Sequence, residues 1–392
     1  MNDIIEASII ITSYNASERL FLSLLSLKYQ DYPQKYYEAI VVDNGSTDNT
    51  KEMLAKFYSD PLFKFVRVEK NRGIANGRNQ GILKATGKIL IFHDSDMIAT
   101  KNFVRRHIES HREENMVICG LPWKSIYSYF YKNFTPLQIA LFKEYRKNDQ
   151  LISKFKGRHK YQLIKQQHII DQSFLKYSFN HTKHQPYYRE LRKIIKKYSH
   201  NLNGFHFPCL FFLTKNVSAN RERVLDVGLF DENIVKYGYE DQDLGYRLYK
   251  SGCRYKLNYN IISVHQEHPL NYSEDFLFSD DYKDNCNYVC EKYNRIDSID
   301  LILMNSPFIK KQNEIMNDIK RIYNHKRDFE ILNIFLILLQ TRRKNFINQN
   351  AKIKPEVDID FNKILSQIRE LKEKYGCFHF TGTLLSLIKH FY

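Results

Sequence analysis

The 392-residue sequence predicts an α/β protein, with a mostly parallel central sheet flanked by helices and a helical C-terminal region. Over the first hundred residues, short apolar runs alternate with segments of helical periodicity, which is typical of a doubly wound parallel sheet. Polar residues follow the apolar runs, where the carboxyl ends of parallel strands form a ligand-binding edge. We therefore expect an α/β domain over residues 1–272 and a helical region over residues 273–392.

The first strands of this sheet follow in order along the chain. Ala7–Ser13 predicts a buried strand, and Ser17–Leu27 places leucines on one face of a helix. Tyr37–Asp43 predicts the second strand, and a helix begins near Asn49 after a polar turn. Phe63–Glu69 predicts the third strand.

The fourth strand ends in a pair of acids. A helix from Gly73 to about Lys84 precedes the apolar run Ile89–Phe92, which suits a strand buried on both faces. The run is followed by Asp94-Ser95-Asp96. Two carboxylates at a strand end can hold a divalent cation against a substrate phosphate. The alternative is a loop in which both acids only cap turns and helices.

Two other strand ends point polar groups to the same edge, at Thr12–Asn15 and at Asp43. Tyr14 could lie flat against a nucleobase, and Asp43 could accept the imide N–H of a uracil. A packing tyrosine and a turn-forming aspartate are the alternative interpretations. The gathering of three such strand ends at one edge favours a nucleotide site.

The middle of the chain carries a basic, aromatic segment. Lys101–Asn115 predicts a charged helix, and Val117–Leu121 predicts a further strand. Residues 125–200 are rich in basic and aromatic side chains, with helical periodicity in Leu137–Tyr145 and Leu191–Tyr198. Two interpretations stay open for this insertion. Its cations meet phosphate on an acceptor, or it is a helical excursion whose charges face water.

A second group of acids follows the insertion. Asn203–Thr214 predicts a strand, in which Pro208 indicates an edge position. Glu240 and Asp241 lie at the start of a helix that runs to about Ser251, and acids there interact favourably with the helix dipole. The preceding Gly238 leaves room for a substrate to approach.

The remaining sequence predicts one short strand and several helices. Ile261–Val264 is strand-like, and His265 and His268 come directly after it. Helical spacing of apolar residues recurs in Phe308–Tyr323, Asp328–Gln340 and Phe361–Tyr375. We expect these helices to support the α/β domain. Binding of an acceptor, a partner or a membrane surface is the alternative.

The net charge of +16 indicates anionic partners, such as nucleotides, phosphorylated acceptors, lipid headgroups or nucleic acid. The N-terminus does not read as a signal peptide, and no apolar run reaches the roughly 20 residues that span a bilayer. The six cysteines are scattered without a Cys-x-x-Cys pair, which favours reduced thiols. These features predict a cytoplasmic protein, with peripheral contact at the inner face of the membrane left open.

Four motifs occur in order at suitable spacing, and together they resemble the nucleotide-sugar half of a family-2 glycosyltransferase with the GT-A fold. They are Thr12-Ser13-Tyr14-Asn15, Val41–Asp48, Asn71-Arg72-Gly73 with Arg78-Asn79, and Asp94-Ser95-Asp96. The resemblance implies that Tyr14 and Asp43 hold the base and that Arg78 contacts the nucleotide. It also implies that Asp94 meets ribose or donor sugar and that Asp96 binds a metal. The implied nucleotide-sugar site comprises Thr12, Tyr14, Asn15, Asp43, Gly73, Arg78, Asp94 and Ser95.

The segment Gly238–Leu244 resembles the Gly-x-Glu-Asp-x-Asp-Leu signature of galactosyltransferase-type and chondroitin-polymerase-type enzymes. The resemblance implies that Asp241 is the catalytic base and that Glu240 binds the acceptor sugar. It also implies that His265 completes the metal site with Asp96, with His268 as the alternative ligand. A mixed carboxylate and imidazole shell suits Mn²⁺ at least as well as Mg²⁺. The sequence departs from many members at Tyr239, where they carry Trp or Gly.

The implied function is inverting, metal-dependent transfer of a sugar from a nucleotide-sugar, expected to be a UDP-sugar, to an acceptor hydroxyl. The acceptor would be a glycan or a lipid- or phosphate-linked molecule, in cell-surface polysaccharide or glycan synthesis. A GDP- or dTDP-sugar is the alternative donor. Phosphoryl transfer is disfavoured because no Walker loop is present. From another class, the chain could be an inactive basic scaffold for nucleic acid or membrane; its basic charge favours this, but the intact acids at the strand ends argue against it, and nucleic acid is not an expected partner. A processive synthase is disfavoured because the sequence lacks Gln-x-x-Arg-Trp.

Overall fold

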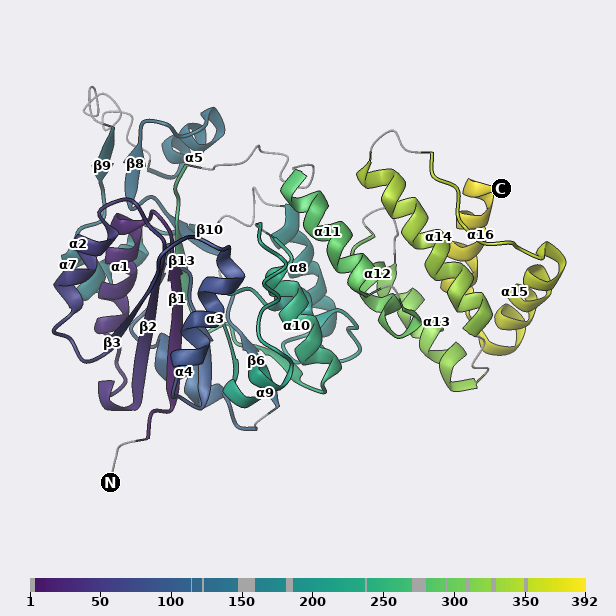
Figure 1. The fold of residues 1–392 in the computed structure, drawn as a ribbon, viewed down its shortest axis with the longest axis horizontal. Coiled ribbons are helices and arrows are strands. Elements are labelled where there is room, and N and C mark those ends of the chain that lie inside the picture. The colour runs from purple at the N-terminus through teal and green to yellow at the C-terminus, as the bar shows by residue number, and fades with distance from the viewer. Residues whose placement is uncertain are drawn as a thin grey trace. The chain divides into compact units, whose positions relative to one another are not determined.

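The structure is a computed structural model (Figure 1). It describes residues 4–113, 115–121, 123–146, 159–180, 186–236, 238–269, 280–293, 295–306, 311–325, 329–348 and 352–392. The chain divides into two compact units. The first comprises Met1–Asn203 and Pro208–Glu274, and the second comprises Gly204–Phe207 and Asp275–Tyr392. The residues of the candidate site belong to the first unit.

A seven-stranded sheet forms the centre of the first unit, in the order β12-β6-β11-β4-β1-β2-β3. Neighbouring strands are parallel except at β11, which runs antiparallel to β4 and β6. The strands are β1 (Ala7–Ser13), β2 (Tyr37–Asn44), β3 (Phe63–Val68), β4 (Ile89–Phe92), β6 (Met116–Cys119), β11 (Val217–Asn220) and β12 (Arg254–Leu257). The predicted fold class, a mostly parallel sheet with flanking helices, is confirmed.

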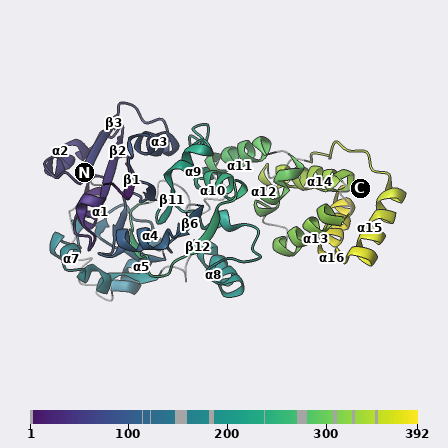
Figure 2. The ribbon, with the colours of Figure 1, turned by 90° about the horizontal axis from the view of Figure 1, so that it is seen from below.

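Helices cover both faces of this sheet because successive side chains of a strand point to opposite faces. Ile9 of β1 belongs to the core cluster that contains Leu20 of α1 (Ser17–Lys28). The next residue, Ile10, lies against Gly81 of α3 (Ile74–Lys84). Figure 2 shows α1 and α3 on opposite sides of β1 and β2. The short helix α2 (Thr50–Leu54) packs beside α1.

A second sheet brings a late strand next to the acidic turn after β4. Its order is β10-β7-β13-β5, and β13 pairs antiparallel with β5 so that His265 lies opposite Met97. A separate pair, β8-β9, also forms. The strands are β5 (Met97–Ala99), β7 (Lys124–Ile126), β8 (Tyr129–Tyr131), β9 (Lys160–Gln162), β10 (Phe179–Asn180) and β13 (Ser263–Gln266). The predicted strand over Ile261–Val264 therefore exists, but it begins at Ser263.

The insertion over residues 125–200 contains strands as well as helices. The helices predicted over Leu137–Tyr145 and Leu191–Tyr198 are present within α5 and α8. Besides α1, α2 and α3, the helices among the described residues of the first unit are α4 (Phe103–Ser110), α5 (Pro136–Arg146), α7 (Gln166–Ile170), α8 (Pro186–Tyr198), α9 (Arg221–Asp226) and α10 (Glu240–Lys250).

The strand predicted over Asn203–Thr214 is wrong. Pro208–Phe211 forms a 3-10 helix, and the strand of this region, β11, begins at Val217. Most apolar residues of the predicted strand are buried without sheet pairing; Phe212, for example, packs against Phe92. The true strand, Val-Ser-Ala-Asn, has no continuous apolar run. Its buried Ser218 is instead satisfied by hydrogen bonds with histidines of the first half of the chain.

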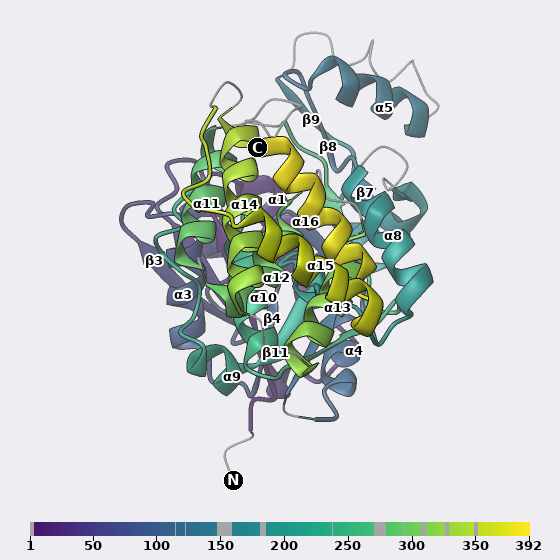
Figure 3. The same cartoon turned by 90° about the vertical axis from the view of Figure 1, so that its right-hand side faces the viewer.

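The second unit is helical, as predicted. Its helices are α11 (Asp280–Lys292), α12 (Ile299–Met304), α13 (Gln312–His325), α14 (Phe329–Ile347), α15 (Phe361–Tyr375) and α16 (Phe378–Phe391). α16 packs against α13, α14 and α15 (Figure 3). The starts predicted at Phe308 and Asp328 lie outside the described residues, whereas the helix predicted over Phe361–Tyr375 is α15. Among the described helices, none has the length and apolar character to cross a bilayer.

Candidate active site

The carboxyl ends of β1, β2 and β4 form one edge of the sheet. Ser13 pairs with Asp43 in the parallel register of β1 and β2, and β4 pairs with β1 on its other side. Asn15 adopts a left-handed backbone conformation, with φ of 49°. Its side-chain carbonyl accepts hydrogen bonds from the backbone N–H groups of Thr47 at 2.8 Å and Asp48 at 3.3 Å. The first two loops of the edge are thus tied together.

Asp43 is buried, and both of its carboxylate oxygens have partners. Oδ1 accepts the backbone N–H of Ser46 at 2.9 Å, and Oδ2 forms an ion pair with Arg67. Tyr14, by contrast, is 49% exposed, so its ring surface is accessible to a ligand. The hydroxyl of Thr12 is buried without a hydrogen-bond partner.

Two glycines let α3 approach the edge closely. A Cβ at Gly77 would lie 2.5 Å from the Thr12 methyl group and 3.2 Å from the Asn44 side chain. Gly73, at the start of α3, has φ of 95°, and a Cβ there would lie 2.6 Å from the carbonyl oxygen of Val235. A side chain at Gly77 would push α3 away from the strands, and a side chain at Gly73 would meet the backbone at Val235 and be strained by the positive φ.

Arg78 of α3 is the centre of a buried charge cluster. Its Nη1 lies 3.1 Å from Oε1 of Glu240 and 3.1 Å from Oδ1 of Asp241. Its Nη2 lies 3.2 Å from Oδ1 of Asp94 and donates to Thr214 Oγ1 at 2.5 Å. The side chain is only 4% exposed. Burial would lower the pKa of Arg78, but the three carboxylates raise it, so the guanidinium stays charged.

Asp241 is held at both oxygens. Oδ1 faces Arg78, while Oδ2 accepts the backbone N–H of Thr214 at 3.0 Å and its hydroxyl at 3.1 Å. Burial and the neighbouring acids Glu240 and Asp94 raise its pKa to about 7, against the lowering effect of Arg78 and the Thr214 N–H. A carboxyl group with this pKa can take up and release a proton near neutral pH.

The start of α10 fixes the two acids in place. Gly238 and Tyr239 both have positive φ, at 106° and 72°, and the chain turns sharply into the helix there. The backbone N–H of Gly238 donates to Oε2 of Glu240 at 3.0 Å. About one turn later, Asp243 forms an ion pair at 2.6 Å with Arg247 of the same helix, which stabilises α10.

Asp96, His265 and His268 form the one group among the described residues whose ligand atoms are close enough to hold a metal ion. Asp96 Oδ2 lies 3.5 Å from His265 Nε2 and 3.2 Å from His268 Nε2. The Nδ1 atom of His265 lies 3.2 Å from a carboxylate oxygen of Glu267, so that Nε2 points toward Asp96. Asp96 Oδ1 is buried without a hydrogen-bond partner. Two imidazoles, one carboxylate and an unsatisfied buried oxygen fit a divalent cation.

The neighbouring charges of this group also shift the pKa values of Asp96 and His265. Burial would raise the pKa of Asp96, but the imidazoles of His265 and His268 lower it well below its usual value. Burial and Lys215 would lower the pKa of His265, but Asp96 and Glu267 raise it.

The structure thus places the predicted site residues in three adjoining groups. Tyr14, Asn15 and Asp43 occupy the β1 and β2 ends, and Asp94, Glu240 and Asp241 surround Arg78. Asp96 meets both candidate histidines, and Ser95 lies in the turn between the two acids.

Several partners of the site were not predicted. Thr214 gave no sequence signal, because its role depends on the fold placing it beside Asp241. Glu267 did carry one, since an acid between two histidines can orient an imidazole. Asn79 directly follows Arg78, and its contacts were not predicted. It donates to the carbonyl oxygen of Phe230 and to Glu232, and so joins α3 to the segment before α10.

Known proteins resemble this chain over most of its length. The family model described as glycosyl transferase family 2 matches residues 8–179. An uncharacterized glycosyltransferase of Bacillus subtilis, YfnE, is 41% identical over 391 residues, which cover 98% of this chain and 96% of YfnE. The chondroitin synthase of Escherichia coli is 28% identical over 270 residues, covering 67% of this chain and 35% of that enzyme. The crystal structure of S. aureus TarS superposes with a TM-score of 0.49 at 15% identity, covering 88% of this chain and 54% of TarS.

Proposed function

Because the chain belongs to glycosyl transferase family 2, and is thus a glycosyltransferase that uses a nucleotide-sugar, we propose a finer function for it. It is an inverting, metal-dependent enzyme that moves a sugar from a UDP-sugar to a hydroxyl group of a glycan or of a lipid- or phosphate-linked acceptor. The observation that carries this proposal is the buried cluster in which Arg78 contacts Oδ1 of Asp241 and Thr214 donates to its Oδ2.

In the proposed reaction, Asp241 is the catalytic base. Its carboxylate takes the proton of the acceptor hydroxyl while that oxygen forms a bond to the anomeric carbon of the donor sugar. The bond from the anomeric carbon to the diphosphate breaks on the opposite side, and the diphosphate leaves with the electron pair. Attack and departure on opposite sides invert the anomeric centre, so no covalent intermediate with the protein forms.

Asp96 and His265 would hold the divalent cation, with His268 as a further or alternative ligand. A bound Mn²⁺ or Mg²⁺ would neutralise charge that develops on the leaving diphosphate. Glu267 orients His265 through Nδ1, which leaves Nε2 available on the side of Asp96.

The donor nucleotide would lie along the edge formed by β1, β2 and β4. We propose that the exposed ring of Tyr14 stacks on the base and that Asp43 accepts its imide N–H. A carboxylate has about four acceptor positions, so Asp43 can add this bond to the two it already makes. Thr12, Asn15, Gly73 and Ser95 would line the same site, and Asp94 would meet ribose or donor sugar.

The resemblance assigns Arg78 to the nucleotide, but its contacts support another role. Its guanidinium contacts three carboxylates and the hydroxyl of Thr214. We propose that Arg78 is a positioning residue, which holds Asp241 and Glu240 in place. Glu240, which borders the base, would then hold the acceptor sugar beside Asp241.

Asp241→Asn and Asp96→Ala test the two halves of this proposal. A thermal-shift screen of UDP-, GDP- and dTDP-sugars, with and without Mn²⁺, first identifies the donor. We then expect Asp241→Asn to slow release of UDP from that donor, with water as acceptor, by about a hundredfold or more. The Asp241→Asn variant should bind UDP with Mn²⁺ as tightly as the unchanged chain in calorimetry. The Asp96→Ala variant should lose this Mn²⁺-dependent affinity for UDP.

Asp226→Asn is the matched control, because the Asp226 side chain is 63% exposed at the surface. Full turnover by Asp241→Asn would refute the assignment of the base. Normal affinity of Asp96→Ala for UDP with Mn²⁺ would refute the metal site. Stabilisation by a GDP- or dTDP-sugar instead of a UDP-sugar would correct the donor. Salt-sensitive binding to DNA or anionic vesicles, without stabilisation by any nucleotide-sugar, would indicate the inactive scaffold.

A further inference from the structure

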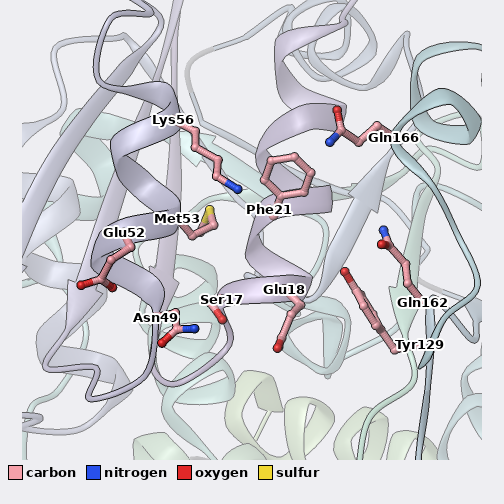
Figure 4. A pocket seen from close by; sticks show the side chains of 10 residues that line it. All are labelled: Ser17, Glu18, Phe21, Asn49, Glu52, Met53, Lys56, Tyr129, Gln162 and Gln166. Atoms are coloured by element: carbon pink, nitrogen blue, oxygen red, sulfur yellow. The ribbon is translucent and has the colours of Figure 1, made fainter. Parts of the chain in front are cut away.

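A cavity of about 400 Å³ lies on the outer side of α1, apart from the cluster around Arg78 (Figure 4). Ligand pockets commonly have volumes of about 300–1,000 Å³. One wall is α2 with the residues that follow it, and the other wall is formed by β8, β9 and α7. The lining residues are Ser17, Glu18, Phe21, Asn49, Glu52, Met53, Lys56, Tyr129, Gln162 and Gln166.

The insertion builds one whole wall of this cavity. Tyr129, Gln162 and Gln166 all come from residues 125–200, and they stand opposite α2 across the floor formed by α1 (Figure 4). An ion pair between Lys160 of β9 and Glu18 of α1 ties this wall to the floor. The insertion therefore does more than extend into solvent, since it closes a pocket against the α/β core.

The lining offers hydrogen-bond donors and acceptors around aromatic surface. Carboxylates come from Glu18 and Glu52, and carboxamides come from Asn49, Gln162 and Gln166. Two rings, those of Phe21 and Tyr129, add apolar area. Carboxylates and amides together can bind hydroxyl groups that donate and accept at once, while an aromatic ring packs on the C–H groups of a sugar.

The lining of this pocket does not share the excess positive charge of the protein. The protein as a whole carries a net charge of +16, yet the lining contains two carboxylates and one amine. That amine, Lys56, lies over the ring of Phe21 at 5.5 Å, at the end of the pocket away from Asn49 (Figure 4). Because Glu18 is paired with Lys160, the carboxylates and amines at the pocket balance, so a phosphate group finds no excess of positive charge here, and a neutral polyhydroxyl ligand needs none.

The pocket begins next to the edge that would bind the donor. Ser17, in its lining, donates its backbone N–H to Asp48 at 3.2 Å, and Asp48 in turn is bonded to Asn15. We propose that this pocket is a secondary saccharide site, which binds an uncharged sugar unit of the glycan at a distance from the reacting hydroxyl. The proposal rests on the proposed function, because it assumes that the enzyme acts on a glycan.

Methionine methyl NMR can test the pocket and the donor site separately in the full chain. The sequence contains six methionines, so ¹³C-methyl labelling gives a sparse spectrum. Met53 lines the pocket, and Met97 directly follows Asp96. Met53→Leu and Met97→Leu assign the two signals. The probes for the pocket are cellobiose and N,N′-diacetylchitobiose, with inorganic phosphate as the anionic probe and glycerol as the unspecific polyol.

We expect either disaccharide to shift the Met53 signal in a saturable manner, with no such shift from phosphate or glycerol. Glu52→Ala combined with Gln166→Ala removes one hydrogen-bonding group from each wall and should weaken this binding about tenfold or more. The matched control combines Lys51→Ala with Gln167→Ala, on the same two helices but outside the lining. The control should bind like the unchanged chain.

Three results would overturn the secondary site. They are no response of Met53 to either disaccharide, equal weakening in the wall variant and the control, and saturable binding of phosphate in place of sugar. Mn²⁺ with UDP should broaden the Met97 signal, because a paramagnetic ion next to Asp96 speeds relaxation of nearby nuclei. If Met97 responds and Met53 does not, the secondary site fails and the proposed function stands. The reverse result removes the metal site and leaves the saccharide pocket.

Discussion

Replacing Arg78 should move the pH dependence of the reaction, because this guanidinium lowers the pKa of Asp241. In Arg78→Met, the side chain keeps a similar length but loses its charge. At the observed Nη1–Oδ1 distance of 3.1 Å, Coulomb's law gives about 5 kcal/mol for an effective dielectric constant of about 20. This equals about four pKa units as an upper limit. Since three carboxylates share the cation, we expect a rise of at least about one unit.

The assay is kcat/KM for UDP release as a function of pH, at saturating Mn²⁺. Asp241 acts as a base only when deprotonated, so the acidic limb should lie near pH 7 in the unchanged enzyme. In Arg78→Met the limb should move to higher pH, and activity should recover when the pH is raised. Arg78→Lys keeps one positive charge and should shift the limb less.

A control separates this effect from protonation of the histidines of the proposed metal site. A limb caused by His265 or His268 would move with the Mn²⁺ concentration, because protons and metal compete for the same nitrogen atoms. A limb caused by Asp241 would not. An acidic limb that stays within about half a unit in a folded Arg78→Met would refute the positioning role of Arg78. Thermal unfolding of each variant establishes that it is folded.

Two further changes test the structure around the site. Gly77→Ala should lower the free energy of unfolding by about 1–3 kcal/mol in urea titrations, because its Cβ would meet Thr12 at 2.5 Å; Gly382→Ala in α16, where no atom lies within 4 Å of the added Cβ, should not destabilise. Burial would raise the pKa of Glu38, but Lys64 and neighbouring hydroxyls hold it below its usual value. The ionised Glu38 therefore contributes fully to the free energy of unfolding above the usual pKa of a glutamate, and this contribution is lost as the pH falls through the lowered pKa. Glu38→Gln should therefore cost about 1–3 kcal/mol at neutral pH and progressively less in acid, and a constant difference at all pH values would contradict this account.

The parallel strands of the first hundred residues could be predicted from the sequence because they are local apolar runs between clear turns. β1, β2 and β4 are each buried on both faces and need no distant partner to be recognised. The strand β11 could not be predicted, because its buried Ser218 forms hydrogen bonds with His107 and His111, which lie more than a hundred residues earlier in the chain. Polar groups satisfied across such distances leave no local pattern.

The candidate site likewise contains residues that a local pattern predicts and contacts that only the fold reveals. Asp94, Asp96 and Asp241 could be singled out because acids at strand ends and helix starts are visible locally. Their connection through Arg78 could not, since Arg78 and Asp241 are separated by 163 residues. The resemblance implies a nucleotide contact for Arg78, and no local pattern indicates the three carboxylates that the fold places around that side chain.

The central position of β11 bears on the order in which the chain can assemble during synthesis. β11 lies between β4 and β6, so the sheet cannot be completed until more than half of the chain has left the ribosome. Until α10 follows, α3 carries Arg78 without two of its three counter-charges, and burying such a cation alone is costly. Closure of the sheet and neutralisation of Arg78 therefore both wait for the second half of the chain. A nascent chain that ends before α10 has neither a complete sheet nor the proposed catalytic base.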